Sequence, residues 1–119
     1  MKLTEAQWTL LEVLWSGERF SLGEVTNRLH SVNGWSRNTV HTYLTRMEEK
    51  GLVRIDRGSA KPYSAAVSRE ECARQERSEL LTRVYGGAAG DLIAAFLKES
   101  PLSRKEAERL RAMLEDMEV

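Results

Sequence analysis

The sequence predicts a mainly α-helical fold with one small β-hairpin, divided into residues 1–67 and residues 68–119. In the first region, apolar residues recur at helical spacing in three successive segments. Alternating patterns on the two sides of a basic turn then predict a pair of strands. The second region returns to helical spacing. With 119 residues, of which 41% are hydrophobic, the chain suits a small domain with an additional arm.

The first predicted helix follows Thr4 in the stretch "TEAQWTLLEVLW". Thr4 and Gln7 have the spacing of a capping box, in which each side chain bonds the backbone N–H of the other residue. Ser16 and Gly17 end the helix. The residues at helical spacing that form its apolar face are Ala6, Leu10, Leu11, Val13, Leu14 and Trp15.

The second predicted helix lies in "FSLGEVTNRLHSV" and repeats this design. Ser21 and Glu24 form a second capping box. Val25 and Leu29 supply a short apolar face, and the pair Asn33-Gly34 stops the helix.

The third predicted helix is "SRNTVHTYLTRMEEKG", which Ser36 caps and Gly51 ends. A positive φ angle is wanted at such a helix end, and glycine adopts it without steric cost. After the helix, "LVRI" and "YSAAV" read as two short strands joined by the turn "DRGSAKP". The buried stripe of the helix is predicted to be Val40, Tyr43, Leu44 and Met47.

The second region predicts three more helices. "SREE", from Ser68, is a capping box that opens a charged helix, and Gly86-Gly87 ends it. "AAGDLIAAFLKES" is a compact apolar helix, and a further capping box from Ser103 to Glu106 opens the last one. An arm of this size cannot bury all of its apolar faces within itself. They either pack against the first region or form a dimer interface, and the dimer is favoured. The predicted interface residues are Tyr85, Leu92, Ile93, Phe96, Leu97, Leu110 and Leu114.

The outer face of the third helix carries short hydrogen-bonding side chains where a solvated helix usually carries Glu and Lys. Positions advance by about 100° per residue, so Asn38, Thr42 and Thr45 point away from Val40, with His41 beside them. Asn can pair with adenine, Thr can contact the thymine methyl group, and His can donate to guanine N7. This face therefore predicts a helix that enters the major groove of DNA.

Positive charge gathers around the same stretch, although the whole chain has a net charge of zero. Residues 35–63 hold six basic residues against three acidic ones. Three helices followed by a basic hairpin form a winged helix-turn-helix arrangement, in which the hairpin, or wing, contacts the DNA backbone. The residues predicted to contact the backbone are Ser36, Arg37, Arg46, Lys50, Arg54, Arg57 and Lys61.

The stretch "WSRNTVHTYLTRMEEKGLV" resembles the signature W-S-x-x-T-(I/V)-x-T-x-(L/I)-x-R-(L/M)-x-x-K-G of the BlaI/MecI/CopY penicillinase-repressor family. The opening "LTEAQWTLLEVLW" is similar to the first helix of that family, and "VYGGAAGDLIAAFLKESPLSRKEAERLRAML" is similar to its dimerisation region. The resemblance implies a dimeric, DNA-binding transcriptional repressor, with Thr39, His41 and Thr42 on the DNA-reading helix. Together with the helix geometry, the predicted base-reading residues are Asn38, Thr39, His41 and Thr42.

The sequence departs from the family pattern at three positions in the reading helix. Arg37 stands where Pro is frequent, Asn38 where a basic residue is common, and His41 where Arg, Gln or Lys occurs, so a different operator sequence is expected. The antibiotic-responsive members are cut by a membrane sensor metalloprotease before a Phe that usually follows Asn. The corresponding pair is Ala95-Phe96, which disfavours that mode of induction. The CxC…CxC motif of the copper-sensing branch is absent.

Other features limit the possible functions. Cys72 is the only cysteine, which excludes an intrachain disulfide and disfavours a zinc site or a redox role. No apolar run approaches the roughly 18 residues of a membrane span, and the N-terminus has no signal-peptide pattern, so the default location is cytoplasmic without membrane insertion. No nucleotide-binding, zinc-protease or hydrolase motif suggests an enzyme or a cofactor. Glu48 and Glu49 are interpreted as a solvated helix end, and the three Trp residues as packing residues.

The sequence therefore favours a cytoplasmic homodimeric repressor that binds a two-fold symmetric operator through its third helix and wing. Two alternatives stay open. One is a winged-helix regulator that responds to a small molecule, and the other is a protein–protein adaptor of the same fold that does not bind DNA.

Overall fold

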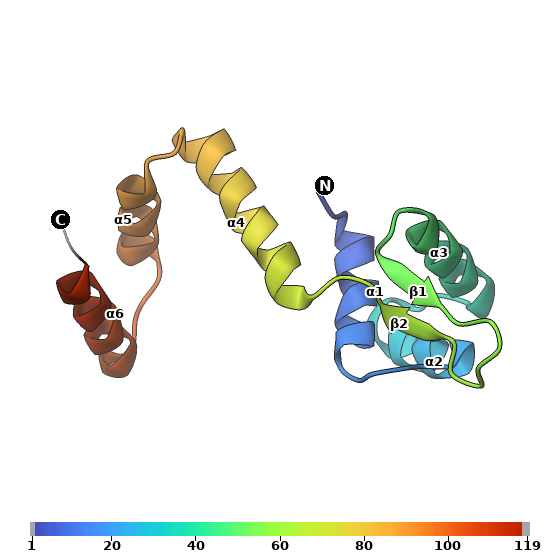
Figure 1. Cartoon of the computed structure of the whole chain (residues 1–119). Helices are drawn as coiled ribbons and strands as arrows, with labels where there is room; N and C mark the ends of the chain where they lie inside the picture. The colour runs from blue at the N-terminus through green and yellow to red at the C-terminus, as the bar shows by residue number, and fades with distance from the viewer. Residues whose placement is uncertain (1, 118–119) are drawn as a thin grey trace. The chain divides into compact units, whose positions relative to one another are not determined.

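The computed structural model describes residues 2–117, so residues 1, 118 and 119, at the ends of the two predicted regions, lie outside the described part. The predicted mainly α fold with one hairpin is confirmed (Figure 1). The elements are α1 (Glu5–Trp15), α2 (Leu22–Asn33), α3 (Arg37–Glu49), β1 (Val53–Ile55), β2 (Tyr63–Ala65), α4 (Arg69–Tyr85), α5 (Ala89–Glu99) and α6 (Arg104–Asp116).

The chain forms two compact units. The first unit ends at Arg77 and the second unit begins at Ser78, so α4 contributes to both. The sequence predicted a domain boundary between residues 67 and 68, after the hairpin. That boundary stays a prediction.

The first three helices begin as the capping residues predict. Thr4 with Gln7, and Ser21 with Glu24, form the two reciprocal capping boxes. The Ser36 hydroxyl accepts a hydrogen bond from the Thr39 backbone N–H at 3.3 Å. These bonds satisfy backbone donors that a helix cannot pair internally in its first turn, and they fix where each helix begins.

Residues of α1, α2, α3 and the hairpin build the hydrophobic core of the first unit, and these elements lie together in the ribbon (Figure 1). On α3, Val40, Leu44 and Met47 are buried as predicted, whereas Tyr43 is half-buried and stacks on Trp35. The largest fully buried side chains are Leu10, Leu11 and Leu14 of α1, Val25 and Leu29 of α2, and Val40, Leu44 and Met47 of α3.

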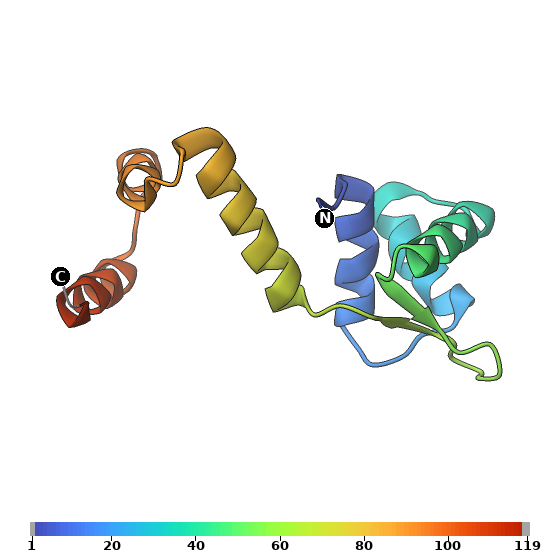
Figure 2. The ribbon, with the colours of Figure 1, turned by 45° about the horizontal axis from the view of Figure 1, so that its top comes forward.

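The hairpin follows α3 closely. Gly51 has the predicted positive φ of 77°, and the Leu52 N–H donates to the Met47 carbonyl at 2.9 Å. The strands are antiparallel, with Ile55 opposite Tyr63. A bridge that the sequence did not predict joins Phe20 to Tyr63, through backbone bonds of 2.8 and 3.0 Å. The tip of the hairpin extends past the helices (Figure 2).

The start of α4 packs on the first unit. Cys72 is buried in its core, and the indole N–H of Trp8 donates to Glu76 at 3.4 Å. Ser68 accepts a hydrogen bond from the Glu71 backbone N–H at 3.1 Å, whereas the Glu71 side chain pairs with Arg74. Within the described residues, only one half of the predicted capping box at Ser68 is therefore present.

The second unit contains the end of α4 with α5 and α6. Gly86 and Gly87 have φ angles of 56° and 89° and separate α4 from α5, as predicted. Ser103 and Glu106 form the predicted capping box of α6. Neither α5 nor the described part of α6 contains a buried residue. Between residues 2 and 117 no single helix is long and apolar enough to cross a membrane, and only α4 taken with α5, bent by 94°, meets those criteria.

Candidate nucleic-acid interface

One face of α3 is exposed along its first two turns. Asn38, His41 and Thr42 are exposed, and Thr45, predicted to share their direction, is half-buried. The opposite face holds Val40, which is fully buried. The helix is thus fixed to the core on one side and free to contact a ligand on the other.

Hydrogen bonds at the start of α3 limit what its hydroxyl groups can offer to a ligand. The Thr42 hydroxyl donates to the Asn38 carbonyl at 2.9 Å, so its only proton is used within the helix. The Ser36 and Thr39 hydroxyls lie 3.1 Å apart and bond each other. Thr39 is half-buried. Thr42 therefore offers its methyl group and its oxygen lone pairs, whereas Asn38 and His41 make no side-chain hydrogen bond within residues 2–117.

An open hollow of about 220 Å³ lies on this face and is lined by Asn38, Thr39, Thr42 and Tyr43. The Tyr43 ring stacks on the Trp35 ring, with the centroids 4.3 Å apart and the planes 18° apart. These residue types supply an amide, hydroxyl and methyl groups and an aromatic ring, and the edge of a base presents both polar atoms and, in thymine, a methyl group.

Four predicted phosphate contacts are exposed cations. Arg37 begins α3, Arg46 and Lys50 lie near its end, and Arg54 lies on β1. Across residues 2–117 none of the four makes an ion pair with an acidic side chain. Their charge is therefore available to an anionic partner.

The two predicted cations of the wing are paired with acidic side chains. Arg57 donates from Nη1 and Nη2 to the two carboxylate oxygens of Glu48, each at 2.8 Å. These hydrogen bonds hold the pKa of Glu48 below its usual value and raise the pKa of Arg57. Glu48 is thus not the solvated helix end that the sequence suggested, because the wing folds back onto it.

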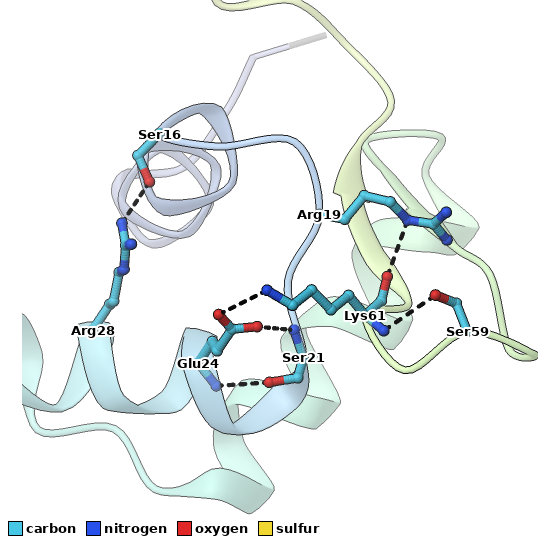
Figure 3. A network of polar contacts seen from close by, with 7 residues as sticks. All are labelled: Ser16, Arg19, Ser21, Glu24, Arg28, Ser59 and Lys61. Atoms are coloured by element: carbon cyan, nitrogen blue, oxygen red, sulfur yellow. Dashed lines mark hydrogen bonds and ion pairs between the residues drawn. The ribbon is translucent and has the colours of Figure 1, made fainter.

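Lys61 is held toward the start of α2. Its Nζ lies 3.4 Å from the Glu24 carboxylate, its backbone N–H donates to Ser59, and its carbonyl accepts from Arg19 (Figure 3). The Ser21 backbone N–H is the main cause of the lowered pKa of Glu24, with Lys61 adding to it. These contacts tie the hairpin turn to the region between α1 and α2.

The base of the wing carries a further ion pair that the sequence analysis missed. Arg19 donates to Asp56 at 2.6 Å. This hydrogen bond, with one from the Gly58 backbone, lowers the pKa of Asp56. The partners are 37 residues apart, and no local pattern could have revealed the contact.

The predicted dimer residues lie on the second unit, and four of them, Ile93, Leu97, Leu110 and Leu114, line the same groove. Ile93, Phe96, Leu97, Leu110 and Leu114 are exposed, while Tyr85 and Leu92 are half-buried. An apolar groove of about 380 Å³ lies between α5 and α6, lined by Ile93, Leu97, Leu102, Ala107, Leu110, Arg111, Met113, Leu114 and Met117. Ala95 of the suspected cleavage pair is half-buried, and Phe96 is exposed on α5.

Comparison with known proteins extends over nearly the whole chain. The sequence model of the penicillinase repressor family matches residues 3–116. The penicillinase repressor of Staphylococcus aureus is 25% identical over 118 residues, which cover 98% of this chain and 94% of that protein. The methicillin resistance regulatory protein MecI of Mammaliicoccus sciuri is 24% identical, with 95% and 93% covered. The penicillinase repressor of Bacillus licheniformis is 24% identical, with 97% and 91% covered.

Two solved structures are also similar to this chain. A probable transcriptional regulator from Pseudomonas aeruginosa has a TM-score of 0.39 at 24% identity, covering 94% of this chain and 76% of that one. A MarR/EmrR family regulator from Acinetobacter sp. ADP1 has a TM-score of 0.44 at 18% identity, covering 97% and 78%. Both scores are too low to add to the argument. The family assignment depends on the match to residues 3–116, and by that match the chain belongs to the penicillinase repressor family, whose members are transcriptional repressors and not enzymes.

Proposed function

We propose that this protein represses transcription in the cytoplasm by binding duplex DNA as a homodimer, with α3 in the major groove and the wing along the backbone. The observation that carries the proposal is the division of α3 into two faces. Val40, Leu44 and Met47 are buried, and the opposite face offers Asn38 and His41 in the first two turns. Such a helix can enter a groove without disturbing the fold that holds it.

The proposed roles on DNA follow from the contacts. Asn38 and His41 have free polar groups for base edges, and Thr42 offers a methyl group to thymine. Thr39 is proposed to read bases less directly, because Ser36 occupies its hydroxyl. The unpaired cations supply phosphate attraction that does not depend on sequence, from Arg37, Arg46, Lys50 and Arg54.

Two reasons support the homodimer. One winged helix reads only a short site, and two-fold symmetric operators are read by dimers with equally symmetric surfaces. The second unit also exposes Leu97, Leu110 and Leu114, which line one apolar groove. Monomeric proteins rarely leave such a surface in water.

Selection of bound sequences from a random duplex pool, followed by a salt titration on the winning site, tests the proposal. We expect a two-fold symmetric site and an affinity that falls steeply with salt. Absence of salt-dependent binding to any duplex would contradict repression through DNA and favour the adaptor. Release of DNA by a saturating small molecule would favour the ligand-responsive regulator.

A cognate membrane sensor metalloprotease is a weaker candidate partner. We propose that the bond between Ala95 and Phe96 is a poor cleavage site, because it lies inside α5 and a protease needs an extended substrate. Co-expression with such a protease and mass spectrometry of the repressor should show the intact chain. A single cut before Phe96 would contradict this proposal.

A further inference from the structure

The end of the reading helix α3 holds the wing through one well-formed ion pair. Both oxygens of the Glu48 carboxylate accept from Arg57, each at 2.8 Å. The Arg57 side chain is 67% exposed and the Glu48 side chain 28% exposed, so the pair lies at the surface with its cation outward. The Arg57 guanidinium is thus already bound to a carboxylate in the folded chain without DNA.

A carboxylate and a phosphate compete for the same groups of an arginine. Both anions bind the planar guanidinium through two parallel N–H···O bonds. A phosphate that takes the two Nη donors of Arg57 must displace Glu48. A phosphate that binds on the Nε side instead is repelled by the Glu48 carboxylate across the shared guanidinium. In either geometry, Glu48 reduces what Arg57 contributes to DNA affinity.

We propose that Glu48 is an internal competitor of DNA phosphate for Arg57, and that this pair sets the affinity of the wing for the DNA backbone. The inference rests on the proposed DNA-binding function and adds an acidic residue to an interface otherwise defined by its cations. The pair links α3 to the wing, so a phosphate that displaces Glu48 from the Nη donors also releases the end of the reading helix from the wing.

The neighbouring residues provide controls for this proposal. Glu49 follows Glu48, is exposed, and makes no ion pair or side-chain hydrogen bond within the described chain. Neutralising it changes the net charge equally and leaves Arg57 paired. Lys61 has a single longer contact of 3.4 Å to Glu24, without the two-pronged geometry, so a smaller competition is expected there.

The test compares the wild type with Glu48→Gln, Glu49→Gln, Arg57→Gln and the double variant Glu48→Gln with Arg57→Gln. Binding of the full-length protein to its selected operator and to a scrambled duplex is measured at several salt concentrations. Thermal unfolding of each variant shows that the fold is kept. We expect Glu48→Gln to tighten binding to both duplexes by about two- to fivefold per half-site more than Glu49→Gln, the range expected for an exposed ion pair. This excess should disappear when Arg57 is also replaced.

The other outcomes are equally informative. Equal effects of Glu48→Gln and Glu49→Gln, or an excess that persists without Arg57, would overturn the competition while the wild type still binds DNA. Weaker binding by Glu48→Gln would show that Glu48 positions the wing, and would overturn it as well. A wild type that binds neither duplex at any salt concentration would overturn the proposed function and the competition together.

Discussion

The first unit buries its large apolar side chains, whereas the second unit leaves them on its surface. Among the described residues, nine of the ten exposed large hydrophobic side chains lie in the second unit, and Val32 alone lies in the first. In the first unit, α1, α2, α3 and the hairpin all contribute buried side chains to one hydrophobic core. The second unit has two amphipathic helices and no buried residue in them. From this difference we expect the first unit to be stable by itself and the second to need a partner surface.

The largest effect is expected from a pair of matched Leu→Ala substitutions, one in each unit. Leu44→Ala removes a fully buried side chain and should lower the free energy of unfolding by about 2–5 kcal/mol. Leu114→Ala, which is 60% exposed, should change it by less than about 0.5 kcal/mol at a protein concentration too low for association. Urea unfolding measures both. Equal losses of unfolding free energy would show that the second unit has a hydrophobic core of its own.

Charges on the apolar surface should separate the proposed dimer. The double variant Leu97→Glu with Leu114→Glu places two carboxylates on that surface, where burial against a second copy would desolvate them. Sedimentation should find a monomer, and the affinity for a two-fold operator should fall by more than about tenfold because the half-sites are no longer linked. Lys98→Glu, at an exposed position next to Leu97 on α5, serves as control. A double variant that still sediments as a dimer would place the interface elsewhere.

On the first unit, the reading face should carry sequence information and little stability. His41→Ala should cost about 1–3 kcal/mol on the selected operator and far less on a scrambled duplex, because only the operator presents the base that it contacts. Arg46→Gln should weaken binding to both duplexes similarly. It should also lower the slope of log affinity against log salt concentration by about one per half-site. If His41→Ala weakens binding to both duplexes equally, α3 does not read bases through this side chain.

The smallest predicted effect distinguishes the hydroxyl group of Thr42 from its methyl group. Because the Thr42 hydroxyl donates its proton to Asn38, Thr42→Val should keep operator affinity within about 0.5 kcal/mol. Thr42→Ser removes the methyl group and should cost about 1 kcal/mol on a site with thymine at that position. Competition binding against the operator resolves these differences. A larger loss for Val than for Ser would mean that the oxygen makes the contact.

Local chemistry made much of the first unit predictable. Capping residues fixed the starts of α1, α2 and α3, and the glycine at position 51 gave the end of the reading helix, since each of these signals acts within a few residues. The buried face of α3 followed from its spacing in the same way, with the half-buried Tyr43 as the exception.

Contacts between distant residues were not predictable from the sequence. The pair of Arg57 with Glu48 and the pair of Arg19 with Asp56 depend on how the hairpin folds back, and neither follows a helical or strand spacing. The bridge between Phe20 and Tyr63 has the same origin. The residues proposed for the candidate site therefore stay a prediction, and the ion pairs among them depend on contacts that the sequence does not reveal. Two of the six predicted phosphate-contacting cations are paired in the folded chain.

The two faces of α3 also bear on how such a regulator can change its target. Val40, Leu44 and Met47 supply the stability of the helix, and the exposed Asn38 and His41 supply none of that packing. Substitutions at exposed positions away from caps and core seldom change stability by more than about 0.5 kcal/mol. With the reading role proposed above, target choice can drift through the outward residues while the inward ones conserve the fold. An engineer could exchange the outward set for that of another repressor and retain the scaffold.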